Sequence, residues 1–134
     1  MAWIEDIVVD CRHPASVARF WTAVLDGYAV ASYDEAELER LRNKGIMSPE
    51  DDPTVLMEPG PGGGPRFFFV LVPEPKTVKN RLHLDLACDD LDAEVRRLTA
   101  LGARVLHTRG DWVTLADPEG NEFCLRPSTW TPPP

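Results

Sequence analysis

The sequence predicts an α+β protein made of two βαβββ modules, whose strands form an open, cupped mixed sheet with the helices on its outer face. Three observations support this prediction. Apolar residues alternate along several short segments, two longer segments carry them at helical spacing, and the segments follow the same order in both halves. We expect a single domain, residues 1–134, with a first module at 1–75 and a second at 76–134.

The first module begins with an alternating segment, Ile4 to Cys11, which is typical of a strand with one buried face. Residues 14–25 then predict a helix, which Asp26-Gly27 ends. Its inward positions are Val17, Phe20, Trp21 and Val24. Three more strands are expected: Tyr28 to Tyr33, Thr54 to Glu58 and Arg66 to Val72.

Two segments lie outside this plan. Residues 34–53 predict an insertion in which Asp34 to Lys44 forms a short charged helix, with Leu38 and Leu41 inward, that covers one end of the cavity. The Pro/Gly run 59–65 cannot hold regular structure, so we expect a flexible hairpin tip, with a mobile lid as the alternative.

The second module repeats the order of the first. Leu82 to Cys88 predicts a strand, and Leu91 to Leu101 predicts a helix that Gly102 ends. Asp117 to Asn121 has the residue types of a tight turn between the last two strands. The remaining strands are expected at Arg104 to Thr108, Trp112 to Ala116 and Glu122 to Arg126.

Composition excludes several classes of protein. A net charge of −8 without a Lys/Arg cluster argues against a nucleic-acid partner. No apolar run is long enough to span a membrane and the first residues lack a signal-peptide pattern, so we expect a cytoplasmic protein with no membrane partner. Cys11, Cys88 and Cys124 lack C-x-x-C spacing and are expected to be small core residues.

The segment Asn80 to Leu86 carries the most chemical information. Alternation places His83 and Asp85 on one face of the strand, and three leucines at 82, 84 and 86 on the other. We expect the leucines to be buried and the two polar side chains to form the floor of a small-molecule pocket. Asp85 either fixes the orientation of His83 or acts as a general base.

The last strand adds two more candidates on one face, Glu122 and Cys124. We expect both to line the pocket together with Trp112, with Asp85 and Glu122 as the candidate catalytic carboxylates. Cys124 is expected to be an inert small residue, because a nucleophilic thiol would need His83 within hydrogen-bond reach. Arg81, beside the cavity strand, either orients an anionic ligand or braces the module junction.

A resemblance to a known superfamily lies in three segments, Phe20–Gly27, Lys76–Leu86 and Asp117–Cys124. Together they resemble the vicinal oxygen chelate superfamily of glyoxalases, bleomycin-resistance proteins and extradiol dioxygenases, in particular its small glyoxalase-like bacterial branch. The resemblance implies paired βαβββ modules around an open cavity, which is often completed in a homodimer.

Metal-dependent members of that superfamily place metal ligands on the cavity faces of their strands. The resemblance carries these positions onto His83, which matches, onto Asp6, where histidine or glutamate is more usual, and onto Cys124, where glutamate is expected. The strand 66–72 supplies no carboxylate or imidazole. We therefore expect no complete metal site and no cofactor. The alternative is a divalent ion held by Asp6, His83 and a further carboxylate.

The expected function is binding of a small organic molecule in the cupped cavity by a homodimer, and whether the protein is an enzyme is left open. The alternative is a divalent-metal-dependent lyase, isomerase or dioxygenase of the same superfamily. A third possibility is a protein-interaction module that uses the inserted segment.

Overall fold

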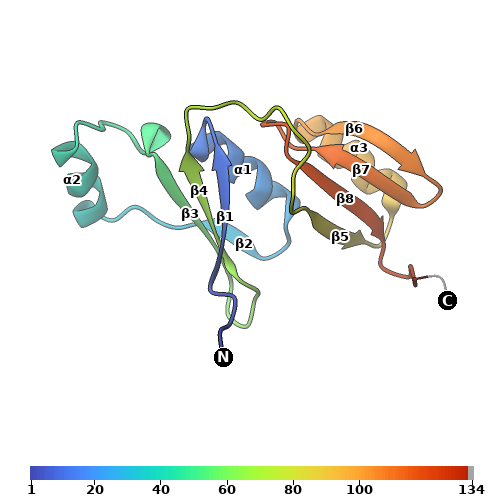
Figure 1. Cartoon of the computed structure of the whole chain (residues 1–134). Coiled ribbons are helices and arrows are strands. Elements are labelled where there is room, and N and C mark those ends of the chain that lie inside the picture. Colours follow the sequence, from blue (N-terminus) through green and yellow to red (C-terminus); the bar gives the residue numbers. More distant parts are fainter. Residues whose placement is uncertain (133–134) are drawn as a thin grey trace. The chain divides into compact units, whose positions relative to one another are not determined.

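The computed structural model describes residues 1–132 and divides the chain into two compact units, Met1–Pro75 and Lys76–Pro134 (Figure 1). The first unit contains β1 (Asp6–Cys11), α1 (Pro14–Val24), β2 (Tyr28–Val30), α2 (Glu35–Asn43), the 3-10 turn η1 (Pro49–Asp51), β3 (Thr54–Pro59) and β4 (Arg66–Leu71). The second contains β5 (Leu84–Cys88), α3 (Leu91–Leu101), β6 (Arg104–Arg109), β7 (Trp112–Ala116) and β8 (Glu122–Pro127).

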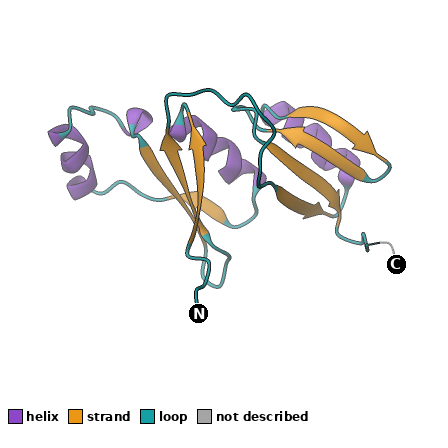
Figure 2. Ribbon diagram, in the orientation of Figure 1, coloured by secondary structure: helices purple, strands orange, loops and turns teal. Residues whose placement is uncertain are grey.

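Each unit forms one four-stranded mixed sheet with the same topology (Figure 2). The strand orders are β1-β4-β3-β2 and β5-β8-β7-β6. In both sheets the first strand pairs in parallel with the last, and the other pairs are antiparallel. The predicted α+β class and its βαβββ repeat are confirmed. No helix within residues 1–132 has the length and apolar character needed to cross a membrane.

The core of the first unit lies between α1 and one face of its sheet. Phe69 and Met57 are fully buried there, while Phe68, between two buried phenylalanines, is only half-buried. The other face is open: Val8, Phe68 and Leu56 are register partners across β1, β4 and β3, and Val8 is 59% exposed. Burying each large apolar side chain contributes about 1.5–3 kcal/mol, so the helix-covered face dominates the stability of this unit.

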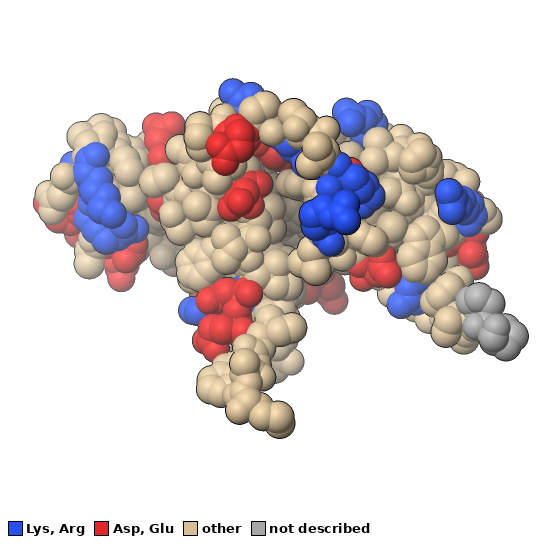
Figure 3. Space-filling view, viewed as in Figure 1, with Lys and Arg blue, Asp and Glu red and all other residues tan. Residues whose placement is uncertain are grey.

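The predicted insertion helix is confirmed as α2. Asp34 caps it by accepting a hydrogen bond of 2.8 Å from the backbone amide of Glu37, and Leu41 is buried. Ion pairs link acidic and basic residues along its exposed surface, where both signs of charge lie side by side in Figure 3. α2 is therefore held by one buried leucine, its cap and surface pairs.

A buried hydrogen bond ties the two ends of the insertion together. The Tyr33 hydroxyl donates to Asp52 Oδ2 at 2.8 Å, and the other carboxylate oxygen accepts from the Thr54 amide at 2.9 Å. Asp52 is only 3% exposed. Burial raises the pKa of Tyr33 far above its usual range, and the hydrogen bond to Asp52 raises it further, so the hydroxyl remains a donor.

In the second unit α3 packs on one face of the sheet, where Leu98 of the helix and Phe123 and Leu125 of β8 are fully buried. The predicted strand at Leu82 is wrong in its start, because β5 begins at Leu84 and Leu82 is 75% exposed. β5 is an edge strand paired only with β8, starting from Leu84 and Phe123. Glu122 is the β8 residue before Phe123, and it does not extend the pairing with β5. Its side chain instead binds Lys76 and Asn80, in the segment before β5.

Glu122 fastens that preceding segment to the sheet. Its carboxylate accepts hydrogen bonds from Lys76 Nζ and from the Asn80 backbone amide, both at 3.0 Å, and its side chain is 11% exposed. Burial acts to raise the pKa of Glu122, but the bonds from Asn80 and Lys76 outweigh it and lower the pKa. The carboxylate is therefore held in its charged form.

The predicted tight turn before β8 is also present. Asp117, 3% exposed, accepts hydrogen bonds from the backbone amides of Glu119 and Asn121, both at 2.9 Å. Gly120 adopts a φ of +95°, a conformation that favours glycine. The turn fixes where β8 begins and so places Glu122 and Cys124.

We predict that Tyr33→Phe destabilises the protein by about 1–2 kcal/mol, because buried Asp52 loses a hydrogen-bond donor. Urea unfolding followed by circular dichroism measures this loss. Leu38→Met, a substitution of similar volume on α2, serves as the control and should change stability less. A Tyr33→Phe protein as stable as wild type would show that the insertion is held without this bond.

We predict that Glu122→Gln lowers stability by about 1–2 kcal/mol at neutral pH, because the charged hydrogen bonds to Lys76 and Asn80 weaken. The pKa of Glu122 is lowered in the folded state, so its contribution is complete above the ordinary value of 4.5 and is lost as pH falls through the folded-state pKa. Thermal unfolding of both proteins from pH 7 to pH 3 should show a converging difference in Tm. A difference that does not change with pH would contradict this linkage.

Candidate functional site

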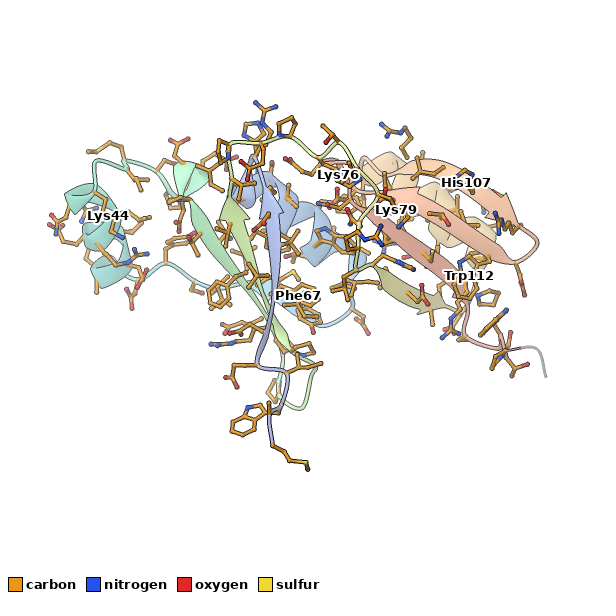
Figure 4. The ribbon with its side chains drawn as sticks, viewed as in Figure 1. Lys44, Phe67, Lys76, Lys79, His107 and Trp112 are labelled. Atoms are coloured by element: carbon orange, nitrogen blue, oxygen red, sulfur yellow. The ribbon has the colours of Figure 1, made fainter. Side chains whose placement is uncertain are left out.

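Polar side chains from four strands meet on the face of the second sheet that α3 leaves uncovered, which we call the open face. Asp85, Cys124 and Thr114 are register partners across β5, β8 and β7, and His107 of β6 pairs with Thr114. Figure 4 labels His107 and Trp112 on this sheet. Partners in register share a face, so these four residues form one polar row.

His83 lies just before β5, at one end of the polar row. Its Nε2 is 3.3 Å from Asp85 Oδ1, and both side chains are 42% exposed. The predicted partnership of these two groups is therefore present, with both in contact with solvent. The position of the histidine beside the carboxylate allows either group to meet a ligand.

Cys124 is buried next to this pair. Its Sγ lies 3.5 Å from Thr114 Oγ1, and the residue is 7% exposed. Thiols become reactive beside a cation, whereas the neighbour of Cys124 in this contact is a neutral hydroxyl. This favours the inert role that we expected for Cys124.

A second group on the open face is formed by Trp112, Arg126 and Trp130. The guanidinium carbon of Arg126 lies 6.0 Å from the Trp112 ring centre and 5.0 Å from that of Trp130. The two indole rings meet edge to face, 5.1 Å apart. We call this group the tryptophan–arginine cluster. Trp112 was predicted to line the pocket.

Sequence reasoning missed Arg126, Thr114 and Trp130. A signal for two of them was available, because the two-residue period that links Glu122 with Cys124 continues to Arg126, and the same period links Trp112 with Thr114. No local pattern connects Trp130 with the sheet. Of the other predicted ligand-binding residues, Glu122 is bound by Lys76 and Asn80, and Arg81 is exposed.

The donors implied by the resemblance do not match a conventional metal site. Asp6, in the first unit, accepts from Arg66 Nε at 2.8 Å and from its Nη2 at 3.2 Å. Strand β4 supplies no donor. His83, Asp85 and Cys124 instead place one ligand atom each within 4.8 Å of one another. Three donors with an open side suit zinc, so the residues fit a three-donor site in the second unit.

The first unit has a groove of its own on the open face of its sheet. Its volume is about 500 Å³, within the range of ligand sites, and α2 borders it. It is lined by Ala31, Ser32, Tyr33, Glu37, Arg40, Asp52, Thr54, Leu56 and Phe68. Its polar groups already pair with one another, Tyr33 with Asp52 and Arg40 with Glu37. The groove is therefore formed by the first unit, whereas the polar row is formed by the second.

Comparison with solved structures shows the same fold in several proteins. A glyoxalase/bleomycin resistance protein/dioxygenase family enzyme from Burkholderia phytofirmans PsJN aligns with a TM-score of 0.63 at 17% identity, over 94% of this chain and 98% of that one. The fosfomycin resistance protein FosX from Mesorhizobium loti aligns with a TM-score of 0.65 at 16% identity, over 98% and 94%. FosX from Listeria monocytogenes aligns with a TM-score of 0.62 at 12% identity, over 96% and 93%.

No curated protein sequence matches the chain significantly. The sequence profile of the glyoxalase-like domain matches residues 6–126, from the start of β1 almost to the end of β8. This range includes both βαβββ units, His83 with its neighbours and the turn before β8. The resemblance to the vicinal oxygen chelate superfamily is confirmed, and the chain belongs to the glyoxalase-like domain family.

Proposed function

We propose that the protein binds a small organic molecule on the open face of the second sheet, without a catalytic metal. The observation that carries this proposal is the position of the His83–Asp85 pair in one polar row with Thr114, on a face that also presents two tryptophans. Ligand sites combine a few convergent polar groups with aromatic surface. The two partly exposed members of the pair remain accessible to a ligand.

The pairing of the other candidate carboxylates supports a metal-free role. Asp6 is bound by Arg66 through both oxygens, and Glu122 is bound by Lys76 and Asn80. Each would have to give up charged hydrogen bonds before it could bind an ion. Proteins of this fold include ones named for bleomycin and fosfomycin resistance, which is in keeping with a ligand of small organic type.

Within this proposal His83 and Asp85 are the groups that contact the ligand. Asp85 either orients the imidazole or accepts a proton from the ligand, and the first role requires only the contact that the two groups already make. Glu122 acts as a structural brace rather than a catalytic group. A homodimer and a cytoplasmic location stay predictions, because a single chain tests neither.

A second candidate function is that of a divalent-metal-dependent lyase, isomerase or dioxygenase. The convergence of His83, Asp85 and Cys124 favours it. An ion bound there would polarise a substrate oxygen. The protein residues would hold the ion and leave its solvent side open, since His83 and Asp85 are both partly exposed.

We predict that small aromatic and polar fragments perturb the amide resonances of Asp85, Thr114 and Cys124 in ¹⁵N NMR spectra. Asp85→Asn should weaken their binding by about tenfold, because one charged hydrogen bond is lost. Asp92→Asn, on α3 at the opposite face of the sheet, is the matched control and should leave the affinity unchanged. Perturbations confined to the groove residues 31–56, with no effect of Asp85→Asn, would move the binding site to the first unit.

We predict that the purified protein retains no stoichiometric zinc, manganese, iron or nickel after chelation and gel filtration. His83→Ala and Cys124→Ser should then leave its metal content unchanged, as should His107→Ala, a histidine outside the three-donor cluster. Elemental analysis of the four proteins makes the test. One equivalent of metal that is lost in His83→Ala and Cys124→Ser but kept in His107→Ala would establish the metal-dependent alternative.

A further inference from the structure

Within the proposed function, on which this inference rests, we infer that the ligand is a small aromatic carboxylate. The carboxylate binds Arg126, and the aromatic ring packs on Trp112 and Trp130. The juxtaposition that carries the inference is a guanidinium held against two indole rings on the same face as the polar row.

Arg126 is one of the arginines of this acidic chain that form no ion pair with a carboxylate among residues 1–132. Five arginines form ion pairs with carboxylates: Arg19, Arg40, Arg42, Arg66 and Arg97. Within residues 1–132 Arg126 forms no such pair, and its buried Nε has no hydrogen-bond partner. Leaving a buried charged donor without an acceptor is unfavourable, so this position calls for an anionic acceptor from outside the chain.

The two tryptophans hold the guanidinium in a geometry that suits a carboxylate. Cation–π contacts occupy the flat faces of the guanidinium and leave its in-plane N–H groups directed outward. Those groups form the paired hydrogen bonds that arginine makes with a carboxylate. The contacts with Trp112 and Trp130 therefore restrict the motion of the Arg126 side chain.

Space beside Arg126 is available on the open face. Its register partner on β5 is Ala87, whose side chain is a single methyl group and which is exposed. On the other side, Trp112 pairs with Arg109 of β6, which adds a second cation to the same row. Asp111 follows Arg109 in the turn and offsets part of that charge.

The indole rings select a flat, apolar ligand body. Trp112 and Trp130 are both half-buried, so each still exposes part of its ring. The segment that carries Trp130 is fixed by hydrogen bonds from the Ser128 amide to Cys88 O at 2.7 Å and from the Trp130 amide to Pro127 O at 3.0 Å. Aromatic rings packed on such surfaces gain contact area at little entropic cost.

Cys124 and Arg126 are two residues apart on β8 and share a face, so a carboxylate on Arg126 directs the rest of the ligand toward the polar row. Thr114 and the His83–Asp85 pair would then contact polar substituents on the ring. Arg126 would thus select for the carboxylate, and the polar row would select among ring substituents.

The test compares three probes that share a naphthalene ring and carry an anionic, a neutral or a cationic group: 2-naphthoate, 2-naphthamide and 2-naphthylmethylammonium. Titrations are followed by the indole and backbone resonances of the ¹⁵N-labelled full-length protein. We expect 2-naphthoate to bind about tenfold more tightly than the amide and more tightly still than the cation, through the charged hydrogen bonds to Arg126. Arg126→Gln should remove this preference, and Arg126→Lys should retain part of it.

Arg96→Gln is the matched control, because Arg96 lies on α3 and not on the open face. Trp130→Ala is the second variant: it removes one of the two indole rings and leaves Trp112 in contact with Arg126. It should weaken all three probes by similar factors while the preference for the carboxylate remains. This outcome distinguishes the contribution of the indole rings to affinity from that of Arg126 to charge preference, even if Arg126→Gln does not fold.

Equal affinities for the three probes, or a carboxylate preference that survives Arg126→Gln, would overturn the inference. If such probes still perturb Asp85 and Thr114, the proposed binding face stands and only the ligand class is wrong. If no probe perturbs any open-face resonance, both the inference and the proposed function are overturned.

Discussion

The two-residue alternation of side chains along paired strands is the constraint on which the rest of this structure depends. In each unit the first strand pairs in parallel with the last, and a helix covers one face of the resulting sheet. Phe123 and Leu125 are therefore committed to the core, and Cys124 between them is directed to the other face. Register then brings it beside Asp85 and Thr114, which come from distant parts of the chain.

Ion pairing decides which of the polar groups remain available for a ligand. Asp6 and Glu122 stand at positions that the sequence marks for function, yet each carboxylate is already bound by a cation and, for Glu122, by a backbone amide. Asp85 lies 3.3 Å from the His83 imidazole, and both side chains are partly exposed. The chemistry of this protein thus follows from what lies beside each acidic group rather than from its place in a family pattern.

Most of the fold could be predicted because its elements carry strong local signals. The helix at residues 91–101 and the strand at 112–116 were predicted with the observed bounds, and the capped insertion helix was found from Asp34 and its inward leucines. The strand predicted from Leu82 begins only at Leu84, and this has a physical reason. The edge strand β5 pairs with β8, and that pairing ends at Phe123, because Glu122 binds the Asn80 amide. In the candidate site the sequence predicted the shared face of His83 and Asp85 but not the contact of Arg126 and Trp130.

The sequence by itself determined the βαβββ repeat, the faces of the strands and the adjacency of His83 and Asp85, because periodicity and spacing are local properties. Only the tertiary structure decided that Glu122 is bound by Lys76 and Asn80, that Asp6 is held by Arg66, and that Trp130 contacts Trp112 and Arg126. These contacts join residues by register, turn geometry and the path of the chain after β8. The energy of each depends on burial and on partners far away in the sequence, which no local pattern contains.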